Sequence, residues 1–438
     1  MKSLLFLPFC MIAFVCGSRQ SAQTENAAQN NSITNEQSAE ITSSQQQGND
    51  TSIEFAAHSS TVSNNQQSSN NANTTASSNR KAASDAGSSS SVETLKPQTA
   101  GLALRDFSWL DKSTNIDLLK IVNSFIVKIY WKDVQSQENG ELKHPNAVDD
   151  ALAYVRKMNA QNPGLNLNLK IRLYCGVYTP DWVKAKAGTF TMYKGGMNNG
   201  GQSTSTQVVK FWKPEFLKFY TDIQSKLAAA YDNTPEITEA VNGGTGILYA
   251  EGMIRNVGAN GAGKKNAMSF AQSDYTSQKD IDAIKNTIDA MKAWKNTRVS
   301  MVFTPFFVIK AQRADEDLSI TKNILDYFVN KFGNQAVLGN NGLRDKYSGD
   351  KSAKWEEGGT LDQVYDMLEN YTKSKNIGVY FQTATVERIG DLKKAIEQGI
   401  QRGAGMIELP TGSNGLLKYT TLEELKKYDA QLEAQAKK

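Results

Sequence analysis

The strongest constraint on the fold is an alternation that fills residues 101–438, where short apolar runs of strand-like character are separated by segments with helical periodicity. The strand-like runs lie near residues 101–107, 125–131, 167–175, 237–250, 299–308, 335–340, 377–382 and 404–409. Between them the apolar residues fall on one stripe of a helix, as Phe216, Phe219 and Ile223 do after Pro214. Strands that alternate with helices in this way pair in parallel, so the sequence predicts an α/β domain.

The number of repeats selects among the parallel-sheet folds. Eight strands, each followed by a helix, in one domain of this length predict a (β/α)8 TIM barrel, and a doubly wound open sheet is the alternative. The last helix is expected to start at Thr421, because Glu424 completes a capping box with it. Since barrel chemistry collects at the carboxyl ends of the strands, the residues at those ends are the candidates for a functional site.

The chain before the predicted barrel has a different character. Residues 1–17 place one lysine before a short apolar run that closes on small residues, which is typical of a secretory signal peptide, and lipidation at Cys16 is the alternative. Residues 18–100 consist mostly of Ser, Asn, Gln, Thr and Ala, with too little apolar surface to offset the entropy of ordering. We therefore expect a disordered linker or stalk, and a protein that is secreted or attached to a cell surface through this segment.

Composition argues against several classes of function. A net charge of +4 over 438 residues, without a dense Lys/Arg block, predicts no nucleic-acid partner. Cys175 is the only cysteine after residue 17 and His144 the only histidine of the predicted barrel, so we expect no cofactor and no His-rich metal site. Residues 258–265, GANGAGKK, have the spacing of a phosphate-binding loop, but Lys265 stands where Ser or Thr is required. We interpret this stretch as a flexible loop.

Three stretches near the ends of the second to fourth predicted strands carry a family resemblance. They are YWKDVQSQENGEL (130–142), IRLYCGVYTPDW (171–182) and GILYAEG (246–252). Together they resemble the retaining glycoside hydrolases of clan A, most closely the β-galactosidase-like barrels of the family 42 type. The chain departs from that family at Gln135 and Ser136, where Glu-Pro is usual, and at Ala250, where the asparagine of an Asn-Glu pair is usual.

The resemblance implies a carbohydrate partner and a pair of catalytic carboxyl groups. Such enzymes place the two groups about 5 Å apart for retention and roughly 6.5 to 9.5 Å apart for inversion. Glu251, at the end of the fourth predicted strand, is implied as the general acid/base. Gln382 occupies the position expected for the nucleophile at the end of strand seven, so Glu408 at the end of strand eight is the candidate second carboxylate. Glu387, or an acetamido group of the substrate, could also serve.

Each implied carboxylate has a structural alternative. Glu251 could be a salt-bridged residue at a strand end, and Glu408 could pair with an Arg or Lys of a neighbouring strand. If the second carboxylate is missing, the barrel would bind sugars without cutting them.

The predicted binding residues are the other polar and aromatic side chains near the strand ends, where sugar C–H faces could stack on rings. They are Trp131, Arg172, Tyr174, Tyr178, Trp182, Asn340 and Gln382. For each aromatic residue, packing in the core is the alternative. The loops at 184–212 and 252–277 are expected to wall the substrate cleft.

Three functions therefore stay open. The first is an exported glycosidase that uses Glu251, and the second is a non-catalytic sugar-binding barrel in which Gln382 bonds a sugar hydroxyl. The third is a surface scaffold whose barrel is only a stable platform.

Overall fold

The computed structural model describes residues 95–111, 114–194, 204–345 and 358–437. The predicted signal peptide and nearly all of the predicted linker lie outside these residues. Within the described ranges, no helix is both long enough and apolar enough to cross a membrane.

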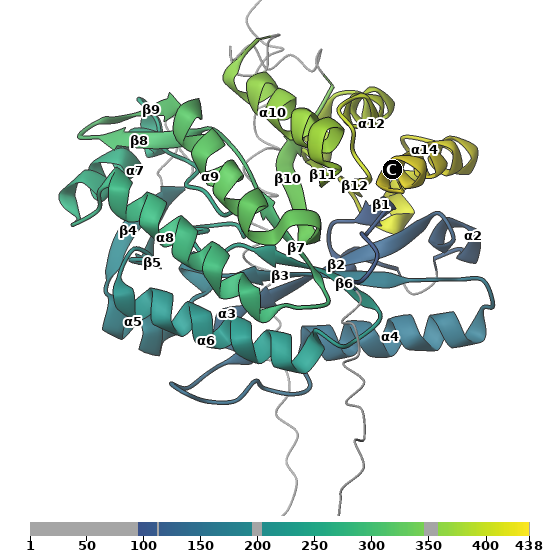
Figure 1. Cartoon of the computed structure of the whole chain (residues 1–438), viewed down its shortest axis with the longest axis horizontal. Helices are drawn as coiled ribbons and strands as arrows, with labels where there is room; N and C mark the ends of the chain where they lie inside the picture. The colour runs from purple at the N-terminus through teal and green to yellow at the C-terminus, as the bar shows by residue number, and fades with distance from the viewer. Residues whose placement is uncertain (1–94, 112–113, 195–203, 346–357, 438) are drawn as a thin grey trace, which may run out of the picture. The chain divides into compact units, whose positions relative to one another are not determined.

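Eight parallel strands close into a barrel in the order β1-β12-β11-β10-β7-β6-β3-β2 (Figure 1). The strands are β1 (Gly101–Leu104), β2 (Val122–Tyr130), β3 (Asn168–Tyr174), β6 (Ile237–Asn242), β7 (Arg298–Val302), β10 (Ala336–Leu343), β11 (Gly378–Thr383) and β12 (Met406–Leu409). The pairing of β1 with β12, which aligns Ala103 with Glu408, completes the ring. The predicted (β/α)8 barrel is confirmed, and the open sheet is excluded.

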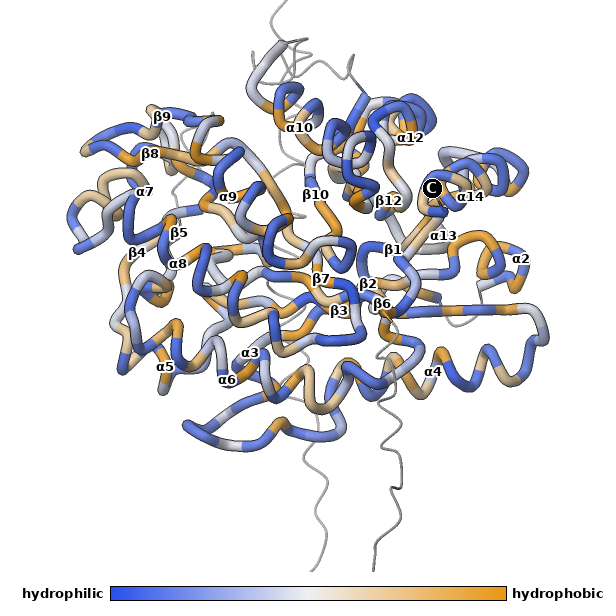
Figure 2. Tube along the Cα trace, in the orientation of Figure 1, coloured by the Kyte–Doolittle hydropathy of each residue, from blue (hydrophilic) through white to orange (hydrophobic). Residues whose placement is uncertain are grey.

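Helices surround the barrel and bury one face against it. They are α2 (Ile116–Leu119), α3 (Trp131–Val134), α4 (Ala147–Gln161), α5 (Asp181–Ala187), α6 (Pro214–Tyr231), α7 (Gly261–Gln272), α8 (Ser277–Ala290), α9 (Leu318–Phe332), α10 (Thr360–Lys375), α11 (Val386–Ile389), α12 (Leu392–Gln401), α13 (Ser413–Leu416) and α14 (Leu422–Ala436). The predicted stripe on α6 is buried at Phe216 and Ile223, and the capping box at Thr421 is present. Along α4, hydrophobic and hydrophilic residues alternate with the turns of the helix (Figure 2).

Two predicted strands differ most from the boundaries in the structure. β6 ends at Asn242, and the glycine-rich residues 243–250 form turns instead of continuing the strand to 250. A Cβ atom on Gly243 would lie 2.9 Å from that of Ala250, so the close return of the chain requires glycine there. The predicted run at 299–308 combines β7 with the first strand of a hairpin, β8 (Phe306–Lys310) and β9 (Arg313–Asp317).

The two loops that were expected to wall a cleft contain regular structure. The first holds an antiparallel hairpin of β4 (Thr189–Lys194) and β5 (Thr204–Val209). The second holds α7, which begins at Gly261 and packs against β4 and the β8–β9 hairpin (Figure 1). The prediction of a flexible loop at 258–265 is therefore wrong over its second half, which forms the first turns of a helix.

Asp280 on α8 should make the stability of the barrel depend on pH. Its side chain is buried and accepts a hydrogen bond from the Tyr275 hydroxyl at 2.9 Å. Burial raises the pKa of Asp280 from 3.8 to about 7. The folded state therefore binds the proton of Asp280 more tightly than the unfolded state does. The protonated carboxyl group contributes roughly 4 kcal/mol to the stability of the fold below about pH 4, and this contribution is lost as the pH rises to about 7.

Asp280→Asn should flatten this dependence, because an amide does not ionise. The difference in unfolding free energy between the variant and the wild type should therefore favour the variant more at pH 8 than at pH 4.5. Urea denaturation of both proteins at both pH values measures it. Asp282→Asn, at an exposed position of the same helix, is the control and should change neither value. An equal effect of Asp280→Asn at both pH values would contradict this account.

Candidate functional site

Polar and aromatic side chains gather at the carboxyl end of the barrel, and we call this group the mouth. Alternate residues of a strand point to the same side of the sheet, so Lys128 and Tyr130 of β2 face inward with Arg172 and Tyr174 of β3. The mouth residues are Arg105, Asp106, Trp109, Lys128, Tyr130, Arg172, Tyr174, Tyr178, Glu251, Asn341 and Gln382.

A buried ionic network lies beneath the mouth, inside the barrel. Glu408 is fully buried, and its Oε1 atom lies 2.7 Å from Nη2 of Arg172 and 3.2 Å from Nζ of Lys170. Lys170 also lies 2.5 Å from Oε1 of Glu239 and 3.0 Å from the centre of the Tyr380 ring. Two carboxylates thus neutralise two cations, which is the condition for keeping charges in a low-dielectric interior.

Glu408 therefore has the structural environment that was the alternative to a catalytic role. Its partners come from β3, which two strands, β1 and β2, separate from β12, and not from a strand adjacent to β12 as that alternative had expected. Burial alone would lower the pKa of Arg172, but the charge of Glu408 raises it above its ordinary value. The guanidinium consequently stays charged.

Arg172 also fixes the orientation of Gln382. The half-buried Gln382 accepts a hydrogen bond at Oε1 from Nη1 of Arg172, at 2.8 Å. Its Nε2 atom has no hydrogen-bond partner among the described residues. Because Oε1 is held by the cation, Gln382 can offer its N–H groups to a ligand but no basic oxygen to an anomeric carbon.

Three half-buried tyrosines form a cluster beside Arg172. The ring centres of Tyr130 and Tyr178 are 4.4 Å apart, and Tyr174 lies 5.5 Å from Tyr130 and 5.8 Å from Tyr178. Burial raises the pKa of both Tyr130 and Tyr174 to about 12, so their hydroxyls stay protonated at neutral pH. Such a cluster offers both ring surface and hydrogen-bonding groups to a ligand.

A second aromatic group adjoins the tyrosine cluster. The half-buried Trp109 ring has the guanidinium of Arg105 at 4.7 Å and the ammonium of Lys128 at 5.5 Å from its centre. Lys128 in turn pairs with Asp106 at 2.5 Å. Cations over an indole ring hold that ring in place, so Trp109 is a fixed element of the mouth.

Glu251 reaches the mouth from the loop after β6 and not from the strand end, which corrects the predicted position. Its Oε2 atom lies 2.9 Å from Nη1 of Arg255, and its Oε1 atom accepts a long hydrogen bond of 3.4 Å from Nδ2 of Asn341 on β10. β6 itself ends at Asn242, which is followed by Gly243, so the Asn-Glu pair that is usual in the resembled family is absent from the strand end.

Three predicted binding residues lie away from the mouth. Trp131 has no exposed surface and packs against Phe216 and Tyr220 outside the barrel. Trp182 packs against α6, with its ring 4.8 Å from that of Phe219. Asn340 points outward, where its amide donates to the Phe303 carbonyl and accepts from the Tyr365 hydroxyl. The predictions for Trp131 and Asn340 are wrong. A binding role for the half-buried Trp182 stays a prediction, whereas Arg172, Tyr174, Tyr178 and Gln382 do lie at the mouth.

The sequence reasoning missed five residues of the mouth that lie on or after β1 and β2: Arg105, Asp106, Trp109, Lys128 and Tyr130. A signal for two of them was present, because Ile126, Lys128 and Tyr130 share the inward face of one strand. That alternation would have favoured Tyr130 over its neighbour Trp131.

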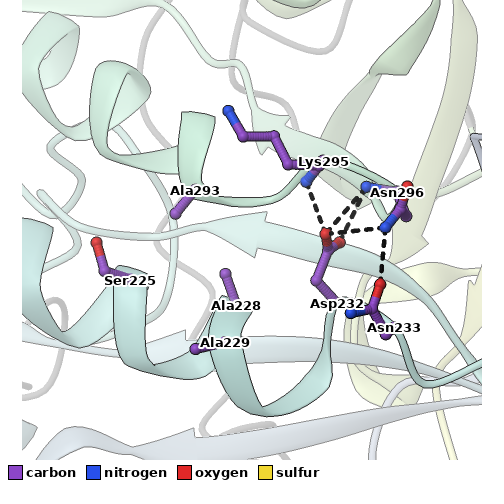
Figure 3. Close-up of a pocket in the computed structure, with 8 residues that line it drawn as sticks. All are labelled: Ser225, Ala228, Ala229, Asp232, Asn233, Ala293, Lys295 and Asn296. Carbon is purple, nitrogen blue, oxygen red and sulfur yellow. Dashed lines mark hydrogen bonds between the residues drawn. The ribbon is translucent and has the colours of Figure 1, made fainter. Parts of the chain in front are cut away.

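A pocket of about 300 Å³ lies at the opposite, amino end of the barrel, between the segments that precede β6 and β7 (Figure 3). Its Asp232 carboxylate accepts hydrogen bonds from the backbone N–H groups of Lys295, Asn296 and Thr297. Since these bonds join two parts of the chain, the role of Asp232 is structural. Among the described residues, no group of three or more His, Cys, Asp or Glu side chains could hold a metal ion.

Searches against models of protein families and among curated proteins give no match. Among solved structures, the chain is similar to the catalytic domain of β-amylase from Paenibacillus polymyxa, with 10% identity and a TM-score of 0.45 over 76% of this chain and 98% of that one. It is also similar to endo-glycoceramidase II from Rhodococcus sp., with 13% identity and a TM-score of 0.41 over 76% and 80%. The β-galactosidase from the psychrophilic Marinomonas ef1 is similar as well, with 13% identity and a TM-score of 0.43 over 76% of this chain and 59% of that one. Likeness of this degree carries no argument about function.

Proposed function

We propose that the chain is an exported protein that binds carbohydrate at the mouth of its barrel and does not hydrolyse it. The observation that carries the proposal is the tyrosine cluster of Tyr130, Tyr174 and Tyr178 beside the oriented amide of Gln382. Half-buried rings next to fixed hydrogen-bonding groups suit a sugar, which has apolar C–H faces and polar edges.

The carboxyl groups support binding over cleavage. Hydrolysis needs two carboxyl groups that both reach the substrate. Glu408 has no exposed surface and is neutralised by two cations, and the position expected for a nucleophile holds the amide of Gln382. Glu251 is the one carboxylate of the predicted pair that adjoins the mouth with some exposed surface, and it is engaged by Arg255.

Hydrolysis with Glu251 as general acid/base is the second candidate function. One observation favours it: Asn341 of β10 donates to Glu251, so the carboxyl group extends from the loop after β6 towards the end of a different strand. A second carboxyl group would then have to come from elsewhere, with Glu387 or a substrate acetamido group as the predicted sources.

One experiment on the full chain separates these functions. A panel of oligosaccharides, polysaccharides and aryl glycosides is tested for binding by calorimetry and for turnover by release of reducing ends. We expect binding without turnover, and we expect Tyr174→Ala to weaken binding by about tenfold or more through loss of ring stacking. Turnover that disappears in Glu251→Gln would replace the binding proposal with the hydrolase, and a panel without either response would remove both.

We further propose that residues 1–17 direct export and that the following segment links the barrel to a cell surface. The proposal rests on the apolar run after Lys2 and on the composition of residues 18–100. Cleavage after residue 17, read from the N-terminal sequence of the mature protein, would support secretion by a signal peptidase. A lipid-modified Cys16 at the mature N-terminus would favour the alternative.

A further inference from the structure

We propose that the ligand of the mouth is an acidic oligosaccharide, whose sugar units carry a carboxylate. This inference rests on the proposed function and adds the chemical class of the ligand. Its basis is that protein groups already engage the carboxylates of the mouth, whereas several hydrogen-bond donors of the mouth are available. Among the amide oxygens of the mouth, Oδ1 of Asn341 has no partner among the described residues.

The carboxylates at and below the mouth are engaged. Asp106 accepts hydrogen bonds from the backbone N–H of Ser108 at 2.9 Å and from its hydroxyl at 2.7 Å, and it also pairs with Lys128. Glu251 is held by Arg255 and Asn341, and Glu408 is buried between two cations. A sugar hydroxyl that must donate a proton to one of these carboxylates would compete with a partner already present.

Donors remain on the side of the mouth formed by β2, β3 and β11. Nε2 of Gln382 and the hydroxyls of Tyr130 and Tyr174 make no hydrogen bond among the described residues. Lys128 has one ion pair for an ammonium group that carries three N–H donors. Nε2 of Gln382 and the ammonium group of Lys128 can only donate, so a ligand that bonds these two groups must supply acceptors, whereas the tyrosine hydroxyls can also accept.

These donors lie close to one another. Lys128 is aligned with Arg172, and Tyr130 with Tyr174, on the paired strands β2 and β3. Arg172 then joins this pair of strands to Gln382 on β11 through their hydrogen bond. One compact group therefore combines two cations, each paired with a carboxylate, with two hydroxyls and an amide N–H.

A carboxylate matches this group better than a neutral hydroxyl does. It accepts several hydrogen bonds through two oxygens, and bonds from a cation to a carboxylate are roughly twice as strong as neutral ones. The rings of the tyrosine cluster would meanwhile contact the C–H face of the same sugar. A sulfate ester would also accept from these donors, and the test below separates the two groups.

The test compares ligands with and without a carboxylate, and ligands that carry a sulfate ester in its place. The full chain is titrated by calorimetry with oligogalacturonate and oligomannuronate, with their methyl esters, and with sulfated neutral oligosaccharides of similar length. We expect a uronate to bind at least about tenfold more tightly than its methyl ester at low salt, and this ratio to shrink as the salt concentration rises.

Two variants examine the proposed group directly. Gln382→Glu replaces the available donor with a carboxylate and should reduce the acid-to-ester ratio about tenfold, and Lys128→Gln should reduce it by a smaller factor. Lys157→Gln, at an exposed position near the end of α4, is the matched control and should leave the ratio unchanged, because its neighbour Arg156 pairs with Glu236 at the amino end of β6, opposite the mouth. Because the ratio is measured within one protein preparation, a loss of folded protein does not alter it.

The outcomes distinguish this inference from the function on which it rests. Equal affinity for acid and ester would overturn the acidic ligand and leave carbohydrate binding intact. Tighter binding of the sulfated ligands than of the uronates would replace the carboxylate by a sulfate. Absence of binding to every charged and neutral saccharide would overturn both proposals.

Discussion

Glu408→Gln is expected to lower the free energy of unfolding by about 3–5 kcal/mol. The substitution keeps the shape of the side chain but removes one of two negative charges from the interior of the barrel. Glu239 would then be the one carboxylate left in the network, and it pairs with Lys170. Arg172, which lies further along β3, would lose its ion pair with Glu408. An uncompensated buried charge is costly, whereas a glutamate that faces bulk solvent for catalysis would be cheap to replace.

Urea denaturation at neutral pH measures this loss. Glu433→Gln provides the matched control, because the same chemical change there breaks an exposed pair with Lys437 at 3.4 Å, for which less than about 1 kcal/mol is expected. Equal stability of the Glu408 variant and the control would contradict the structural role of Glu408. It would also reopen its assignment as the second catalytic carboxylate.

Trp131→Ala should be comparably destabilising, by about 3–5 kcal/mol, because it removes a fully buried indole from between the barrel and α6. The loss also breaks the hydrogen bond from its Nε1 atom to Gln135 at 2.9 Å. Since the ring does not reach the mouth, the folded fraction of the variant should bind sugar with unchanged affinity.

Tyr174→Ala should show the opposite pattern, with weak binding and a smaller loss of stability, since its ring is only half-buried. Denaturation curves and calorimetric affinities show which variant loses stability and which loses sugar binding. Both variants are measured at a temperature where each is folded. A stable Trp131→Ala that no longer binds sugar would restore tryptophan 131 to the binding site.

The fold was predictable because its signals are local and repeated. The apolar stripe of α6 and the capping box at Thr421 each depend on residues a few positions apart, and the count of alternating elements then implies the barrel. The end of β6 was not predictable in the same way. Residues 246–250 read as an apolar strand, but the close return of the chain at Gly243 turns them away from the barrel, and that return depends on tertiary packing.

The mouth was predictable in part, and two of the errors have the same physical origin. Neighbouring residues of a strand face opposite sides, so a choice that is wrong by one position selects the outer face. Asn340 was chosen where Asn341 faces inward, and Trp131 where Tyr130 does. The environment of Glu408 had a different cause of difficulty, because its cations lie on a strand that is not adjacent to β12 and is far away in sequence.

The most direct test of the central claim is a crystal structure of the full chain soaked with the tightest-binding oligosaccharide of the panel. The account predicts an intact saccharide at the mouth, with a sugar ring against the tyrosine cluster and a polar atom of the ligand within hydrogen-bonding distance of Nε2 of Gln382. A cleaved saccharide, or a saccharide bound away from the mouth, would contradict it.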